Sequence, residues 1–174
     1  FQAEDLVRDP VLESRIHPYK KHPKIPLPSD LFADRRNSAG LDLNDPRSSA
    51  PVVAFVKSYR KEFIAQSIVD GQRVDPQASG LISRSFVSAR EGFRRWSKID
   101  VEERAAALEK FADLLEAQRD EFMALCVHEA GKTLPDAVAE IREAVDFSRY
   151  YAQEARKDFS AGGVLLPGYT GESN

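Results

Sequence analysis

Apolar side chains recur at the spacing of an α-helix in several stretches after residue 50. The first predicted helix begins at Pro51, because proline suits a first helical turn, and is expected to end by Gly71. Its apolar positions are Val52, Phe55, Val56, Tyr59 and Phe63. Pro76 lies in the loop that follows, and a second, amphipathic helix is expected to end near residue 96. The large apolar side chains of this second helix are Phe86, Phe93 and Trp96.

A third helical stretch starts at Asp100, whose side chain can cap the free backbone amides at the positive end of a helix. Its buried stripe is predicted to comprise Leu108, Phe111, Leu115, Phe122 and Cys126. The polar run at residues 118–121 is expected to divide the stretch into two helices, with Asp120 capping the second. Gly131 is a natural end for that second helix, because glycine adopts the left-handed conformation without steric cost.

The last predicted helix begins at Thr133, which acts as its cap, and carries Pro135 in its first turn. It is expected to run to about Lys157 and to end at the glycine pair 162–163. Residues 164–166 are apolar and predict the start of a strand.

Two stripes run along this last helix, which predicts that it packs on more than one side. The first comprises Val138, Ile141, Val145 and Ala152, and the second comprises Glu143, Phe147 and Tyr150. Arg142, Asp146 and Arg149 are expected to pair with one another along the wetter side of the helix.

The first 51 residues contain seven of the ten prolines, so long helices are not expected there. Residues 17–28 read as an extended linker with a basic cluster, and a solvated linker is favoured over a contact with nucleic acid or an acidic surface. Residues 35–43 predict an irregular segment with a turn near Gly40. The pattern as a whole predicts a mainly α chain with four to five helices and little strand.

Composition narrows the class of protein. Lys and Arg number 25 against 28 Asp and Glu, a net charge of −3, which argues against a nucleic-acid binder. A single cysteine excludes a disulfide framework and any multi-cysteine metal site. No apolar run approaches the roughly 20 residues that span a bilayer. The 174 residues start at Phe1 and end in the polar residues 171–174, so the chain is expected to be a piece of a longer protein.

Candidate reactive groups are sparse. Residues 131–133 (GKT) look like the tail of a phosphate-binding loop, but the preceding strand and glycine are missing, and a helix end followed by a helix start explains them. Cys126 and His128 are two residues apart, about 200° around a helix, so they cannot act as a pair. Cys126 is therefore interpreted as a structural thiol. The three histidines, at positions 17, 22 and 128, have no metal-ligand spacing.

Glu143 is the one candidate binding residue. It shares a stripe with Phe147 and Tyr150, where a carboxylate would need a cationic or hydrogen-bonding partner. The alternative, which the sequence favours, is an ordinary surface glutamate between Arg142 and Asp146. Both interpretations stay open at this point.

Several segments together carry a family resemblance. Residues 104–116 and 125–137 (LCVHEAGKTLPDA) resemble the N-terminal helices of the aldehyde dehydrogenase superfamily. Residues 139–152 (AEIREAVDFSRYYA) resemble the L-glutamate-γ-semialdehyde dehydrogenase (1-pyrroline-5-carboxylate dehydrogenase) half of the bifunctional proline utilization A family. Residues 25–28, 36–43 and 166–174 are similar to the interdomain segment of that family and to the start of its dimerisation flap.

The resemblance implies a parent with an α/β aldehyde dehydrogenase fold that oxidises glutamate semialdehyde to glutamate with NAD in proline catabolism. In the family a cysteine thiolate attacks the aldehyde and a glutamate activates water, and both residues lie downstream of the matched stretch. Cys126 is therefore not the nucleophile, and this chain is expected to hold no catalytic, cofactor-binding or metal-binding residue and to be inactive alone. Glu143 matches a family carboxylate that lines the aldehyde entrance, so it is expected to bind substrate. FAD would belong to a proline dehydrogenase half upstream of Phe1.

The same resemblance implies an organisation and a setting. Residues 1–46 would be an interdomain linker, residues 47–161 the helical N-terminal part of the dehydrogenase domain, and residues 162–174 the start of the flap. The expected partners are a small-molecule substrate and the rest of the same polypeptide, in a homo-oligomeric parent. The parent is expected to be a cytoplasmic bacterial enzyme that touches membranes only through its other parts, and no nucleic acid is expected to bind this stretch.

Two departures from the family leave a second function open. The stretch after Gly71 is shorter than usual, and His128 stands where an arginine is common. Either the chain is the N-terminal piece of the bifunctional enzyme, or it is a stand-alone helical interaction or regulatory module derived from it. In both cases, helix faces shaped for missing partners are expected to remain exposed.

Overall fold

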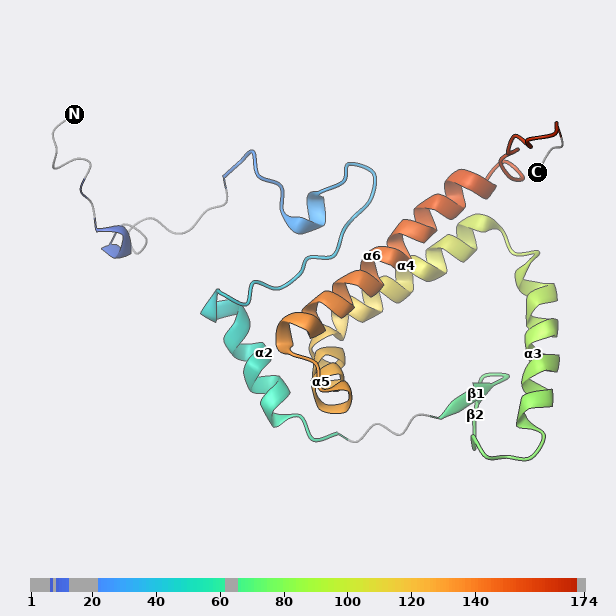
Figure 1. Cartoon of the computed structure of the whole chain (residues 1–174), viewed down its shortest axis with the longest axis horizontal. Helices are drawn as coiled ribbons and strands as arrows, with labels where there is room; N and C mark the ends of the chain where they lie inside the picture. Colours follow the sequence, from blue (N-terminus) through green and yellow to red (C-terminus); the bar gives the residue numbers. More distant parts are fainter. Residues whose placement is uncertain (1–6, 8, 13–21, 62–65, 172–174) are drawn as a thin grey trace.

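The computed structural model describes residues 7, 9–12, 22–61 and 66–171 and shows a mainly α chain, as predicted (Figure 1). Its helices are α2 (Pro46–Ser58), α3 (Leu81–Trp96), α4 (Val101–Ala117), α5 (Arg119–Ala130) and α6 (Leu134–Phe159), with a 3-10 turn η2 (Pro28–Asp30). The sheet formed by the described residues is a two-stranded hairpin of β1 (Ser67–Val69) and β2 (Gln72–Val74). None of the helices in these ranges is both long and apolar enough to cross a membrane.

The helices α4 and α6 lie side by side along most of their length, and α5 and α2 pack at one end of this pair (Figure 1). The core lies where these four helices meet and comprises Val52, Val56, Ala112, Leu115, Met123, Ala124, Ala137, Ile141 and Val145. Three of the nine residues are alanines, so the helix backbones can approach closely. The predicted stripe of α6 is confirmed, because Ile141, Val145 and Ala152 are buried.

Three helix ends lie at the capping residues that the sequence predicts. The Asp100 carboxylate accepts a hydrogen bond from the Glu102 amide at 2.8 Å, and Thr133 Oγ1 accepts one from the Asp136 amide at 3.3 Å. Gly131 ends α5 with φ +64°, the left-handed conformation that favours glycine. The predicted break is confirmed, but the residue preceding α5 is Gln118, and Asp120 lies in the first turn, where it pairs with Arg119.

The predicted first helix is wrong at both ends. It begins at Pro46, because the Asp45 side chain caps it by accepting the Arg47 amide at 3.0 Å, and Pro51 lies within it. It ends at Ser58, and Phe63 lies outside the described residues. Gly71 does not end a helix: Asp70 and Gly71, with φ +52° and +75°, form the turn between β1 and β2.

Two further expectations are corrected by the packing. Leu108 and Phe111 of the predicted buried stripe are 38% and 50% exposed, because small residues of α4, Ala105 and Ala112, lie on its buried face instead. Residues 164–166 form no strand and are more than half exposed, since no neighbouring strand in the described part of the chain offers hydrogen bonds.

The expected exposed apolar surface is confirmed. The helix α3 has no buried residue and stands apart from the α4–α6 pair (Figure 1). Its exposed apolar side chains are Ile82, Phe86, Val87, Phe93 and Trp96.

Candidate functional site: the strap and the outer face of α6

An extended segment, residues 35–40, crosses α4 and α6, and we call it the strap. The Ser38 amide donates to Asp146 Oδ1 at 2.6 Å, and the Ser38 hydroxyl donates to Asp146 Oδ2 at 2.9 Å. The Ala39 amide donates to Glu116 Oε1 of α4 at 3.0 Å. Asn37 and Ser38 are buried, and the Asn37 amide nitrogen, oriented toward Asp146, lies 2.8 Å from Oδ1. The irregular segment predicted here is therefore an ordered link between the two helices.

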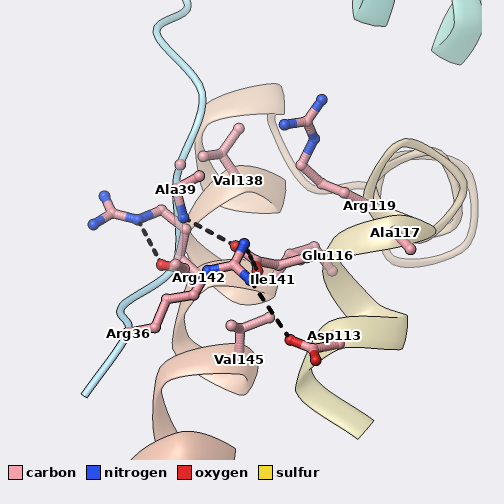
Figure 2. Close-up of a pocket in the computed structure, with 12 residues that line it drawn as sticks. Arg36, Ala39, Asp113, Glu116, Ala117, Arg119, Val138, Ile141, Arg142 and Val145 are labelled. Carbon is pink, nitrogen blue, oxygen red and sulfur yellow. Dashed lines mark hydrogen bonds and ion pairs between the residues drawn. The ribbon is translucent and has the colours of Figure 1, made fainter. Parts of the chain in front are cut away.

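Arg149 joins α6 to α4 beneath the strap. It is 5% exposed, and its Nη2 donates to Asp113 Oδ1 at 2.7 Å and to Glu116 Oε2 at 2.6 Å. Arg36 of the strap pairs with the same Glu116 oxygen at 3.2 Å. Figure 2 shows Arg36 and Ala39 reaching from the strap toward Glu116. The predicted pairing of Arg142, Asp146 and Arg149 with one another is wrong, because the strap and α4 supply their partners.

These contacts shift the pKa values of Glu116 and Arg149. Burial alone would raise the pKa of Glu116, but the Ala39 amide, Arg149 and Arg36 outweigh it and hold that pKa below its usual value. Burial would likewise lower the pKa of Arg149, yet Glu116 and Asp113 raise it overall. Glu116 and Arg149 are therefore both charged at neutral pH.

A cavity of about 380 Å³ opens between the strap, α4 and α6 (Figure 2). The apolar side of the cavity is formed by Val138, Ile141 and Val145. The hydroxyl group among the residues that line it belongs to Ser38. That hydroxyl already donates to Asp146 and accepts from Arg142 Nε at 3.3 Å. Neither histidine nor cysteine lines the cavity, and the Ser38 hydroxyl is engaged in these two hydrogen bonds.

The outer face of α6 carries Glu143. Glu143 is exposed and makes no hydrogen bond or ion pair with the part of the chain that the structure describes. Phe147 and Tyr150, on the same stripe, are 51% and 40% exposed, and Tyr151 packs beside them with ring centroids 6.0 and 5.2 Å away. The second stripe of α6 was predicted to be packed, but in this chain it is an open aromatic surface with a carboxylate at one end.

The other candidate residues have structural surroundings. Burial raises the pKa of the Cys126 thiol, and nearby Glu140 raises it further, so the thiol is protonated at neutral pH. His128 Nε2 lies 2.8 Å from the Val56 carbonyl oxygen, and its ring stacks on Tyr59. Lys132 pairs with Glu140 at 2.7 Å. Residues 131–133 thus join α5 to α6, as the helix-stop interpretation predicts.

Sequence reasoning missed the strap contacts and the burial of Arg149. The signal for Arg149 was present, since it lies four residues after Val145 and eight after Ile141 on the buried stripe. A cation at core spacing indicates a buried ion pair. The contacts of the strap had no such signal, because Ser38 and Asp146 are 108 residues apart.

The described residues thus form a helical layer in which the strap ties α4 to α6 and the outer face of α6 stays exposed. Residues 73–169 match the model of the aldehyde dehydrogenase family, and the chain belongs to that family. The bifunctional protein PutA of Klebsiella aerogenes is 40% identical over 160 aligned positions, which cover 79% of this chain and 12% of that protein. The 1-pyrroline-5-carboxylate dehydrogenase 1 of Halalkalibacterium halodurans is 42% identical over 74 positions, which cover 42% of this chain and 14% of that protein.

Solved structures agree. A crystal structure of bifunctional proline utilization A superposes with a TM-score of 0.70 at 40% identity, covering 87% of this chain and 15% of that one. A variant of the Bradyrhizobium japonicum protein gives 0.66 at 42% identity, with 87% and 14% covered. The described residues therefore have the fold of one part of the proline utilization A aldehyde dehydrogenase, and the chain spans about an eighth to a seventh of the length of these relatives.

The relatives are also longer within the matched span. The PutA protein of Rhizobium meliloti, 32% identical, aligns over 186 positions that cover 94% of this chain, although the chain has 174 residues. The relative thus carries extra residues there, in line with the expected shortening. Its location after Gly71 stays a prediction.

Proposed function

We propose that the chain is the N-terminal part of the NAD-dependent L-glutamate-γ-semialdehyde dehydrogenase half of a bifunctional proline-catabolic enzyme. The supporting observation is the extent of the matches. The relatives named as dehydrogenases alone cover 42% to 59% of this chain, whereas the PutA proteins cover 79% to 94%. The additional match extends the resemblance beyond the dehydrogenase helices, as expected for a fusion.

In this proposal residues 1–46 connect the two halves, residues 47–161 begin the dehydrogenase domain, and residues 162–174 begin the dimerisation flap of a cytoplasmic homo-oligomer. NAD would accept hydride from the substrate, and FAD would serve the upstream half. The described residues include no glycine-rich turn between a strand and a helix, so they do not fit a dinucleotide site. NAD would therefore be held by residues outside this chain.

The role proposed for the chain itself is substrate entry at Glu143. Its carboxylate is free of partners within the described residues and lies beside an aromatic surface, so it can attract the ammonium group of an amino-acid aldehyde. In the parent enzyme, Glu143→Ala is expected to lower kcat/KM for glutamate semialdehyde by about tenfold, the loss of one charge-assisted contact. Glu103→Ala, an exposed glutamate of α4, is the matched control. Equal values for both variants would remove Glu143 from the site.

The 174-residue chain is expected to form no NADH from glutamate semialdehyde and NAD. Absorbance at the NADH band, with the parent enzyme as positive control, measures this directly. Turnover by the chain alone would contradict the proposal.

A stand-alone interaction module is the second candidate, and the exposed apolar side of α3 would be its binding surface. The coding sequence after Asn174 separates the two. The enzyme proposal requires a glycine-rich cofactor strand and a nucleophilic cysteine in the same frame. A stop codon, together with soluble monodisperse protein, would favour the module.

A further inference from the structure

The strap borders the stripe of α6 that carries Glu143. Asp146 lies three residues after Glu143, and Tyr150 lies seven residues after it. Both are therefore on the same side of the helix as Glu143. Asp146 binds the strap through both carboxylate oxygens, at 2.6 Å to the Ser38 amide and 2.9 Å to its hydroxyl. Arg35 lies over the Tyr150 ring, 5.4 Å from its centroid, and its Nη1 is 3.5 Å from the Asp146 carbonyl oxygen.

The strap is also held from the other side, so it does not simply follow α6. The Ala39 amide binds Glu116 of α4 at 3.0 Å. Gly40 adopts φ +70°, and a Cβ there would lie 3.3 Å from Arg142 Nε, so glycine lets the Arg142 side chain pack flat on the strap. Ser38 is 2% exposed. The strap is thus a fixed block between two helices, and Asp146 is where it contacts the turn of α6 that follows Glu143.

We propose that Asp146 is a positioning residue, which by holding Ser38 of the strap fixes the turn of α6 that carries Glu143 at the substrate entrance. This inference rests on the proposed function. It adds that the strap reaches the entrance through its contacts with α6, of which the bond of the Ser38 amide to Asp146 is the shortest. Asp146 touches no reacting group, because both of its oxygens are occupied by the strap. Its loss therefore affects substrate capture and leaves the chemical step unchanged.

The kinetic test uses the parent enzyme. Asp146→Asn and Ser38→Ala are each expected to raise KM for glutamate semialdehyde by about fivefold or more, with kcat within about twofold, since a misplaced binding group weakens capture. Ser38→Thr keeps the hydroxyl and is expected to restore KM, and Asp158→Asn, near the far end of α6, is the matched control. An unchanged KM in an active wild-type background would overturn this inference alone. An inactive wild type would overturn the proposed function instead.

A second measurement uses the 174-residue chain and needs no activity. Amide hydrogen exchange at residues 143–147 is expected to quicken in Asp146→Asn and Ser38→Ala, while residues 152–158 keep their protection. Faster exchange along the whole of α6 would show a general structural role and overturn the inference. So would unchanged exchange at residues 143–147.

Discussion

Arg149 is a charged residue at a core position. It lies on the buried stripe of α6 with Ile141 and Val145, and Asp113 and Glu116 supply its partners. Its Nη1 is buried and has no acceptor in the described part of the chain. A buried cation of this kind is retained only while its carboxylates are present, because an unpaired buried charge is costly.

Arg149→Met is therefore expected to lower the free energy of unfolding by about 3 kcal/mol, since two carboxylates lose their buried partner. Arg36→Met is the matched control. Its side chain is 62% exposed, so its pair with Glu116 should contribute less than about 1 kcal/mol. Urea unfolding followed by circular dichroism measures both. Equal losses would show that burial of Arg149 does not set its contribution.

The lowered pKa of Glu116 predicts how the stability of the chain depends on pH. Its pKa in the folded chain is below the ordinary value of 4.5, so the folded state binds fewer protons than the unfolded state as the pH falls. Its contribution is complete above pH 4.5 and is lost as the pH drops through the folded-state pKa. Unfolding midpoints between about pH 6 and about pH 3 should fall less steeply in Glu116→Gln than in the wild type. If the unfolding midpoints of both proteins fell equally steeply with pH, the role assigned to Glu116 would be contradicted.

At the scale of the element, local capping decided where helices begin and end. Asp100, Thr133 and Gly131 act as predicted, because each signal involves atoms only a few residues apart. The hairpin was missed although Asp70-Gly71 is a strong turn signal between alternating residues. The apolar positions before it favoured one long helix, and Asp45 was overlooked as the cap that starts α2 earlier.

Replacing either of two glycines by alanine is expected to change stability, in opposite directions. Gly131→Ala is expected to destabilise the α5–α6 junction by about 1 kcal/mol, because φ +64° is strained for alanine while nothing lies within 4 Å of the added Cβ. Gly92→Ala, within α3 and equally unobstructed, should stabilise that helix by roughly 0.5–1 kcal/mol. Amide exchange in α3 and urea unfolding measure the two. If both changes destabilised the chain, steric crowding and not the backbone angle φ would set the effect of the added methyl group.

At the scale of the whole molecule, the chain is a packed α4–α5–α6 layer with α2 at one end and α3 set apart (Figure 1). Its apolar surface is distributed over α3, the outer side of α4 and the outer face of α6. Such a surface fits a part of a larger protein better than a self-sufficient domain. It also accounts for the missing strand at residues 164–166, which has no neighbour here.

The double change Phe86→Ser and Phe93→Ser is expected to reduce binding of an apolar fluorescent dye and self-association, because these side chains are 74% and 69% exposed. The unfolding of the α4–α6 layer should stay the same, since α3 contributes nothing buried. Dye fluorescence, size-exclusion chromatography and urea unfolding test this, with Arg90→Gln on α3 as control. A large loss of stability would show that α3 belongs to the core.

The sequence by itself determined the helix ends at Asp100, Gly131 and Thr133 and the buried face of α6, because capping and helical periodicity act over a few residues. It also predicted the family, through short segments that the comparisons confirm. Only the tertiary structure decided that Arg149 lies inside, that Asp146 binds the strap and that the stripe of Glu143 stays open. Those outcomes depend on residues up to 108 positions away, and local spacing carries no information about such distant partners.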